Sequence, residues 1–349
     1  MSPAMAPSFA SVIIELTNHC NFSCPFCPSD AITRPKGFMD PALMDSLLTQ
    51  IARGGLAPVV QFGLMGEPFL HKGLFDMAAR ARELGLFLRV FTNGSRLTEA
   101  NVERVVASGI NELYVSYRGV DASAFAELSR TDFAAYREGV RRLVAAAPRF
   151  PGRVILKVFK DTVYEKALGT DAMGRRMSAG RVEARMEELL AGLVPPVSFA
   201  PDRARANHAV KVTDNVSVRF ETVSRWVSQE NAGREGFVKG VIGACDGLEG
   251  HCGILWNGDV TTCCKDYDGK NVFGNAARRS LVGILDGDAG RRLRRCLKCC
   301  LLPTDYCRQC RGGDTWRDAL VHQLGTIALF KTPLSRLVLG LGRDGDDAP

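Results

Sequence analysis

The chain has 349 residues, of which 46% are hydrophobic and 24% charged, and its formal net charge is +7. This length holds one large domain and one smaller domain, and the apolar content supports a packed core. The N-terminus has no basic segment followed by a long apolar run, which argues against a secretory signal. The apolar C-terminal stretch is too interrupted, by Lys331, Pro333 and Arg336, for a membrane span. No aromatic and basic recognition motif accompanies the positive charge, which disfavours nucleic-acid binding.

The first predicted strand, Ser11–Thr17, leads into a loop that carries Cys20, Cys24 and Cys27 in a CxxxCxxC pattern. The apolar, β-branched residues of this run are typical of a buried parallel strand. Three thiolates in one short loop hold three corners of a [4Fe–4S] cluster and leave the fourth iron without a protein ligand. Structural zinc or a disulfide is the alternative for short cysteine spacings.

Strand-like and helix-like segments alternate along the following residues. Helices are expected at Pro41–Ala52 and after Thr98, whose side chain suits a helix N-cap. Further strands are expected at Val59–Met65, Leu86–Phe91, Glu112–Tyr117, Arg153–Phe159 and Pro196–Ala200, with a helix at Arg181–Leu190. The predicted fold class is therefore α/β: a partial (βα)6 TIM-like barrel, whose active site gathers at the carboxyl ends of the strands.

The cysteine loop resembles the signature of the radical S-adenosylmethionine (radical SAM) superfamily, CxxxCx(aromatic)C, with Phe26 in the aromatic position. Gly66-Glu67-Pro68 resembles the Gly-Gly-Glu element of that family, except that Met65 replaces the first glycine. The resemblance implies that the open iron binds S-adenosylmethionine, that Phe26 lies against its adenine and that Glu67 accepts from its ammonium group.

Polar residues at other strand ends are candidate contacts to the same cofactor. The resemblance assigns Ser116 to the ribose, and Asn93 lies at the end of the third strand. A turn or helix-capping role is the alternative for both. Lys157, on the fifth strand, either reaches the cofactor carboxylate or points outward.

A second field, from Cys245 to Cys310, contains nine of the twelve cysteines. It reads Cys245-x12-Gly-x4-Cys263, followed by the pair Cys307-x2-Cys310, and Trp256–Val260 predicts a hairpin that returns Cys263 toward Cys245. This order resembles the SPASM or twitch extension of radical SAM enzymes, which implies an auxiliary [4Fe–4S] cluster on these four cysteines. A zinc ribbon is the alternative. Adjacent residues of a strand point to opposite faces, so only one of Cys263 and Cys264 is expected to face the cluster.

Five cysteines then remain: Cys252, Cys264, Cys296, Cys299 and Cys300. The last three either contribute to a second auxiliary cluster or form a separate site for a soft ion such as trivalent arsenic. The full SPASM pattern ends with a further cysteine, and none follows Cys310, which disfavours the second cluster. Arg-Cys-Leu-Lys-Cys-Cys also resembles a motif of radical SAM enzymes of organoarsenical, arsinothricin-type biosynthesis. That resemblance implies transfer of the 3-amino-3-carboxypropyl group of S-adenosylmethionine to arsenite. Buried thiols or redundant ligands are the plain alternative.

The sequence thus predicts a radical SAM enzyme that cleaves S-adenosylmethionine to modify a small polar metabolite or a peptide. The expected parts are a barrel at 1–200, a bridging region at 201–239, an auxiliary cluster domain at 240–312 and a helical tail at 313–349. Low-potential clusters favour the cytoplasm. Arginines near the second field indicate either a surface for an acidic electron donor of the flavodoxin or ferredoxin type or a solvated helix face (Arg278, Arg279, Arg291, Arg292, Arg294 and Arg295). The non-enzyme alternative is an iron–sulfur or metalloid carrier.

Overall fold

The computed structural model describes residues 8–24, 27–117, 131–160, 209–222 and 236–332, with residues 122, 125, 126, 129, 226 and 227. Ten strands form one sheet in the order β10-β9-β8-β1-β2-β3-β4-β5-β7-β6. They are β1 (Ser11–Ile14), β2 (Val59–Phe62), β3 (Phe87–Thr92), β4 (Glu112–Ser116), β5 (Arg153–Lys160), β6 (Ala209–Lys211), β7 (Val216–Thr222), β8 (His251–Ile254), β9 (Asp259–Thr261) and β10 (Gly274–Asn275).

The middle of this sheet, from β8 through β1 to β5 and β7, is parallel, whereas β6, β9 and β10 pair antiparallel. The predicted α/β class is confirmed, and the first five predicted strands form within a few residues of their expected bounds. The predicted strand Pro196–Ala200 and helix Arg181–Leu190 lie outside the described residues. Beside β5 the structure places β7, which lies in the region expected as a bridge.

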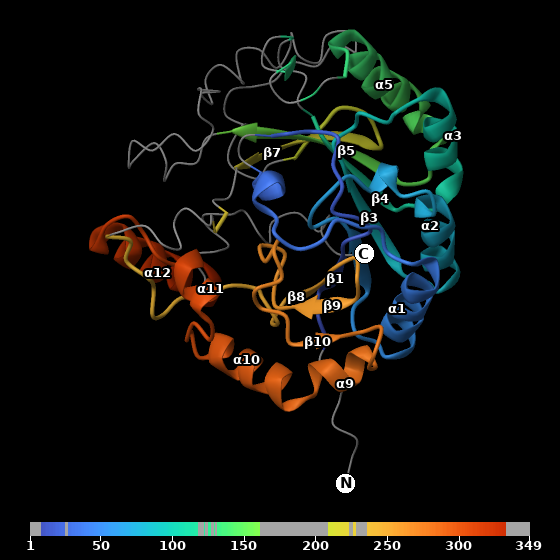
Figure 1. Ribbon diagram of the computed structural model, residues 1–349. Coiled ribbons are helices and arrows are strands. Elements are labelled where there is room, and N and C mark those ends of the chain that lie inside the picture. The colour runs from blue at the N-terminus through green and yellow to red at the C-terminus, as the bar shows by residue number, and fades with distance from the viewer. Residues whose placement is uncertain are drawn as a thin grey trace.

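The helices of the first half are α1 (Pro41–Arg53), α2 (Leu74–Glu83), α3 (Glu99–Ser108) and α5 (Phe133–Ala146), with short 3-10 turns at Pro28–Ala31, Pro68–Leu70 and Ala147–Arg149. Figure 1 shows α1, α2, α3 and α5 along the outer face of the curved sheet. The α1 helix begins at Pro41 because Asp40 caps it, accepting from two backbone N–H groups, and its apolar stripe is buried. Thr98 caps α3 as expected, by accepting from the Asn101 N–H.

Side chains alternate across the parallel strands, which gives the sheet two different faces. On the face toward the helices, Val90, Val115 and Leu156 are fully buried in the apolar core. On the other face, Phe91 stacks on Tyr114, and Lys157 Nζ lies 5.0 Å from the Phe91 ring centroid. The inner face, which points away from the helices, is therefore aromatic and charged, whereas the outer face, which points toward them, is aliphatic.

The C-terminal part continues the same sheet. The β8 and β9 strands form the predicted hairpin, in which Gly258 adopts a φ of +87°, and β8 pairs with β1. This pairing places the second cysteine field beside the first. Four helices follow: α9 (Leu281–Leu285), α10 (Asp288–Lys298), α11 (Asp305–Cys310) and α12 (Trp316–Lys331). Among the described residues, no helix has both the length and the apolar character needed to cross a bilayer.

Candidate active site and auxiliary cysteine cavity

The loop after β1 carries the first three cysteines near the carboxyl end of the parallel sheet. Cys20, Cys24 and Cys27 are all partly exposed, and the Cys27 N–H donates to the Cys24 carbonyl oxygen. Two groups approach the Cys20 Sγ: the Phe22 N–H at 3.5 Å and the Asn93 amide at 3.7 Å. Burial raises the pKa of the Cys20 thiol. Three thiols in one loop, with N–H donors beside the Cys20 sulfur, suit the sulfur-rich ligand set of an iron–sulfur cluster.

Gly66 fixes the loop after β2 against the cysteine loop. Its φ is +76°, and a Cβ at this position would lie 2.1 Å from the Thr17 carbonyl oxygen. The next residue, Glu67, donates its backbone N–H to the carbonyl oxygen of His19. Only glycine allows both the left-handed backbone and this close approach. The second glycine of the family element is therefore required by the packing of two strand ends.

The Glu67 carboxylate joins the ends of β2 and β3. It accepts hydrogen bonds from the Thr92 hydroxyl (2.7 Å), the Asn93 backbone N–H (2.6 Å) and the Phe69 backbone N–H (3.0 Å). Burial raises its pKa to about 7. These three donors orient the carboxylate beside the cysteine loop. Its role toward a cofactor ammonium stays a prediction, and Thr92, at the end of β3, is one of the residues that orient it.

The other candidate cofactor contacts lie on β4 and β5 or outside the described residues. Ser116 ends β4 and is half-buried, with Lys157 as its register partner on β5. Lys157 Nζ faces Phe91 and Tyr114 on the inner face of the sheet. Phe26 lies outside the described residues.

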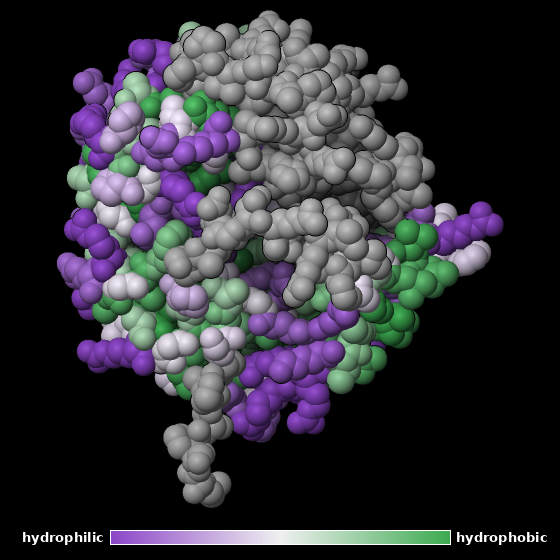
Figure 2. All heavy atoms as spheres, turned by 180° about the vertical axis from the view of Figure 1, so that it is seen from behind, coloured by the Kyte–Doolittle hydropathy of each residue, from purple (hydrophilic) through white to green (hydrophobic). Residues whose placement is uncertain are grey.

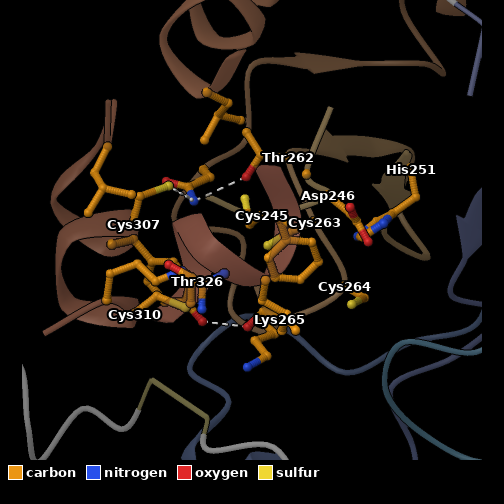
Figure 3. A pocket seen from close by; sticks show the side chains of 18 residues that line it. Cys245, Asp246, His251, Thr262, Cys263, Cys264, Lys265, Cys307, Cys310 and Thr326 are labelled. Carbon is orange, nitrogen blue, oxygen red and sulfur yellow. Dashed lines mark hydrogen bonds between the residues drawn. The ribbon is translucent and has the colours of Figure 1, made fainter. Parts of the chain in front are cut away.

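A cavity of about 320 Å³ gathers the cysteines of the second field. It is lined by Cys245, Cys263, Cys264, Cys307 and Cys310. Figure 3 shows Cys264 across the cavity from Cys307 and Cys310. Cys263 and Cys264 follow the end of β9 rather than lying within it. Both consequently line the cavity, although their side chains diverge.

Local structure brings these thiols together. The α11 helix presents Cys307 and Cys310, three residues apart, on one face, and the Thr304 side chain caps this helix by accepting from the Cys307 N–H. Burial raises the pKa of the Cys245, Cys263 and Cys307 thiols. A bound metal favours the thiolate form that burial alone disfavours, so this donor set fits a thiolate-ligated cluster.

Asn271 adds a polar contact that the sequence patterns did not indicate. It is buried in the cavity wall and donates its amide N–H to Cys307 Sγ at 3.5 Å and to the Thr262 hydroxyl at 3.2 Å. Hydrogen bonds to ligand sulfurs tune iron–sulfur clusters. No local motif identifies this residue, because its contact with Cys307 joins positions 36 residues apart.

The remaining cysteines are separate from this cavity. Cys252 is fully buried in β8, and burial raises its pKa to about 12, as expected for a core thiol. Cys296, Cys299 and Cys300 lie at the end of α10 and do not line the cavity. In the described part of the chain, no three His, Cys, Asp or Glu side chains converge as a site for one metal ion. The role of Cys296, Cys299 and Cys300, as ligands of a second cluster or of a soft ion, stays a prediction.

A buried network connects the two cysteine regions. Arg34, downstream of the first cysteine loop, pairs with Glu15, which directly follows β1, and donates its Nε–H to the Tyr267 carbonyl oxygen at 2.7 Å. The Asp268 carboxylate accepts from the backbone and hydroxyl of Thr33 and from the Arg34 N–H. Trp256 covers the same segment, with its ring against Gly37. The two regions are held as one unit by contacts more than 200 residues apart in sequence.

Two family models match the chain at these two regions. A model described as the Radical SAM superfamily matches residues 14–158, and one described as an iron-sulfur cluster-binding domain, SPASM, matches residues 245–311. The matched segments contain the first cysteine loop and the auxiliary cavity, respectively.

Curated relatives named PqqA peptide cyclase match most of the chain. The protein of Xanthomonas oryzae pv. oryzae (strain MAFF 311018) is 30% identical over 306 residues, covering 83% of this chain and 77% of the relative. The protein of Xanthomonas euvesicatoria pv. vesicatoria (strain 85-10) is 28% identical over 308 residues, covering 83% and 78%. These relatives give no support to the organoarsenical hypothesis.

Solved structures share the fold at low sequence identity. BtrN in complex with AdoMet and 2-DOIA has a TM-score of 0.50 at 18% identity, with 86% of this chain and 92% of that chain covered. Streptococcus suis SuiB bound to precursor peptide SuiA has a TM-score of 0.52 at 14% identity, with 82% and 67% covered.

Proposed function

The chain belongs to the radical SAM superfamily and carries a SPASM domain, and from this membership we propose that it modifies a peptide by radical chemistry. It is an enzyme that uses a [4Fe–4S] cluster and S-adenosylmethionine, and its SPASM domain is a binding domain for auxiliary iron–sulfur clusters. The carrier alternative is therefore wrong.

The residues assigned to the first site are those of the cysteine loop and the adjoining strand ends. Cys20, Cys24 and Cys27 would hold the cluster that supplies the electron for S-adenosylmethionine cleavage. Glu67 would accept a hydrogen bond from the methionine ammonium group, because three donors fix the position of its carboxylate. Asn93, Ser116 and Phe26 complete the proposed cofactor contacts.

The residues assigned to the auxiliary cluster are Cys245, Cys263, Cys307 and Cys310. Their support is the shared cavity and the divergence of Cys264 (Figure 3). The cavity wall would exclude water from the cluster, and Asn271 would donate to the Cys307 sulfur. We also propose the cytoplasm as the compartment, because low-potential iron–sulfur clusters suit a reducing environment.

The proposal of a peptide substrate rests on one observation: relatives named for a peptide cyclase align over 83% of the chain. A similarity confined to the barrel would support only shared cofactor chemistry. We also propose an acidic protein of the flavodoxin or ferredoxin type as electron donor, since the net charge of +7 favours an acidic partner.

An anaerobic assay tests the proposed function. The reconstituted enzyme is given S-adenosylmethionine, a chemical reductant and short peptides encoded near its gene, and the products are analysed by mass spectrometry. We expect 5′-deoxyadenosine and a peptide that has lost two hydrogen atoms, with neither product from a Cys24→Ala variant. Formation of 5′-methylthioadenosine, or consumption of a small metabolite while every peptide stays unchanged, would contradict the proposal.

A further inference from the structure

The α10 helix carries more positive charge than its own stability favours. Within Asp288–Lys298 it has four arginines and one lysine against one acidic residue, and Arg291 alone among them pairs with that residue, Asp288. Arg291 and Arg295 are a like-charge pair at i,i+4, as are Arg294 and Lys298. Such pairs destabilise a helix. The last-turn cations Arg295 and Lys298 suit the helix dipole, but together with the other arginines they concentrate positive charge on one short helix.

The two sides of α10 face different surroundings. Leu293 and Leu297 are buried on the inner side, and Leu297 lines the auxiliary cysteine cavity. The outer side exposes four cations, which we call the basic face: Arg291, Arg292, Arg295 and Lys298. One helix thus separates the cysteine cavity from a positively charged surface.

An exposed apolar patch adjoins the basic face. It consists of Val241 (66% exposed), Ile242 (37%) and Leu301 (49%). Leu301 lies three residues after the end of α10 and donates its N–H to the Cys296 carbonyl oxygen, and it forms an isolated β-bridge with Ile242. Figure 2 shows hydrophilic side chains over α10 at the lower edge of the molecule, with apolar surface beside them. A basic rim next to an apolar contact is the composition of a surface that binds an acidic protein.

The position of α10 argues against the substrate as its partner. The adjoining helix α9 contacts α1 on the outside of the barrel, and Leu281 donates its N–H to the Gln50 side chain there. Glu67 and Asn93 mark the carboxyl ends of the strands, and these ends are not part of the contact between α9 and α1. A partner on the basic face approaches the auxiliary cavity and not the barrel mouth.

We propose that the basic face of α10 and the adjoining apolar patch are the docking surface for the acidic one-electron carrier protein. The proposal rests on the proposed function, which requires such a carrier. In the complex, the reduced carrier would give up one electron, and the cluster that the cavity cysteines would hold behind α10 would accept it. No bond is formed or broken, and the carrier leaves in its oxidised form.

The test compares binding of a purified flavodoxin to the wild type, to R292E/R295E and to a control, R53E/K72E. The control reverses two exposed charges on α1 and the loop before α2, so both variants change the net charge equally. Binding is measured by calorimetry on the reconstituted enzyme at several salt concentrations. We expect R292E/R295E to bind at least about tenfold more weakly, with a flatter salt dependence, and R53E/K72E to bind like the wild type.

A second readout separates this proposal from the proposed function. With a chemical reductant, R292E/R295E should produce 5′-deoxyadenosine at the wild-type rate, whereas with reduced flavodoxin its rate should fall. The milder R292Q/R295Q variant guards against a folding defect and should show an intermediate loss. Equal flavodoxin binding by all variants, or no binding to the wild type at low salt, would overturn the docking surface. Loss of activity with the chemical reductant in the wild type would instead overturn the proposed function.

Discussion

Arg34 and Glu15 form a two-pronged ion pair in which Arg34 Nη1 lies 2.8 Å from Glu15 Oε1 and Nη2 also bonds Oε2. The Glu15 side chain is fully buried and that of Arg34 is 11% exposed. Through the Tyr267 carbonyl oxygen the same guanidinium holds the loop between β9 and β10. The pair therefore stabilises β1 and the contact between the two cysteine regions together.

Removal of Arg34 should therefore lower the free energy of unfolding. Arg34→Ala leaves Glu15 buried without its partner, and we expect a loss of about 3–5 kcal/mol in the free energy of unfolding. Denaturant unfolding of the metal-free chain measures it. Arg149→Ala breaks the fully exposed pair with Glu103 and should have no measurable effect. Similar midpoints for the two variants would show that the buried network does not hold the regions together.

A second prediction concerns Gly66. Gly66→Ala places a Cβ 2.1 Å from the Thr17 carbonyl oxygen, so the loops after β1 and β2 must separate. Gly85→Ala is a matched control, since Gly85 has a similar φ of +70° and no atom within 4 Å. We expect the control to lose about 1–2 kcal/mol of unfolding free energy through backbone strain, and Gly66→Ala to lose more. Gly66→Ala should also have a lower iron content at the first cluster. Unfolding and iron analysis measure both. Equal losses would mean that the close approach to Thr17 is unimportant.

The fold was predictable from sequence as far as local pattern determines it. Apolar β-branched runs identify β1 to β5, and the cysteine spacings identify the two cysteine regions, because parallel strands and metal loops have local signatures. The hydrogen bond from Arg34 to Tyr267 and the Asp268 contacts have none, since they join segments more than 200 residues apart. The pairing of β7 with β5 was also unpredictable, because it depends on how the chain between them returns to the sheet. Asn271 was missed because a single asparagine beside a cysteine cavity is recognisable only in three dimensions.

A third prediction concerns the hydrogen bond from Asn271 to Cys307. Hydrogen bonds to ligand sulfurs stabilise the reduced, more negative cluster. Asn271→Leu removes the donor while keeping every cysteine, so the auxiliary reduction potential should become more negative by tens of millivolts. A redox titration followed by electron paramagnetic resonance measures it. Thr262→Val, which removes the other Asn271 contact, should shift the potential less. An unchanged potential in Asn271→Leu would contradict the tuning role.

The last prediction separates the cysteines that bind a cluster from those that do not. Each [4Fe–4S] cluster brings about four irons, so a chain with one auxiliary cluster should contain about eight. Cys263→Ser should lower this to about four, because its thiol lies among the other cavity ligands, whereas Cys264→Ser should leave it unchanged because that side chain diverges (Figure 3). Replacing Cys296, Cys299 and Cys300 together by alanine should also leave the iron content unchanged, since these residues lie outside the cavity. Iron analysis with Mössbauer spectroscopy measures all three variants. A wild type with about twelve irons, falling to about eight in the triple variant, would instead assign those residues to a second auxiliary cluster.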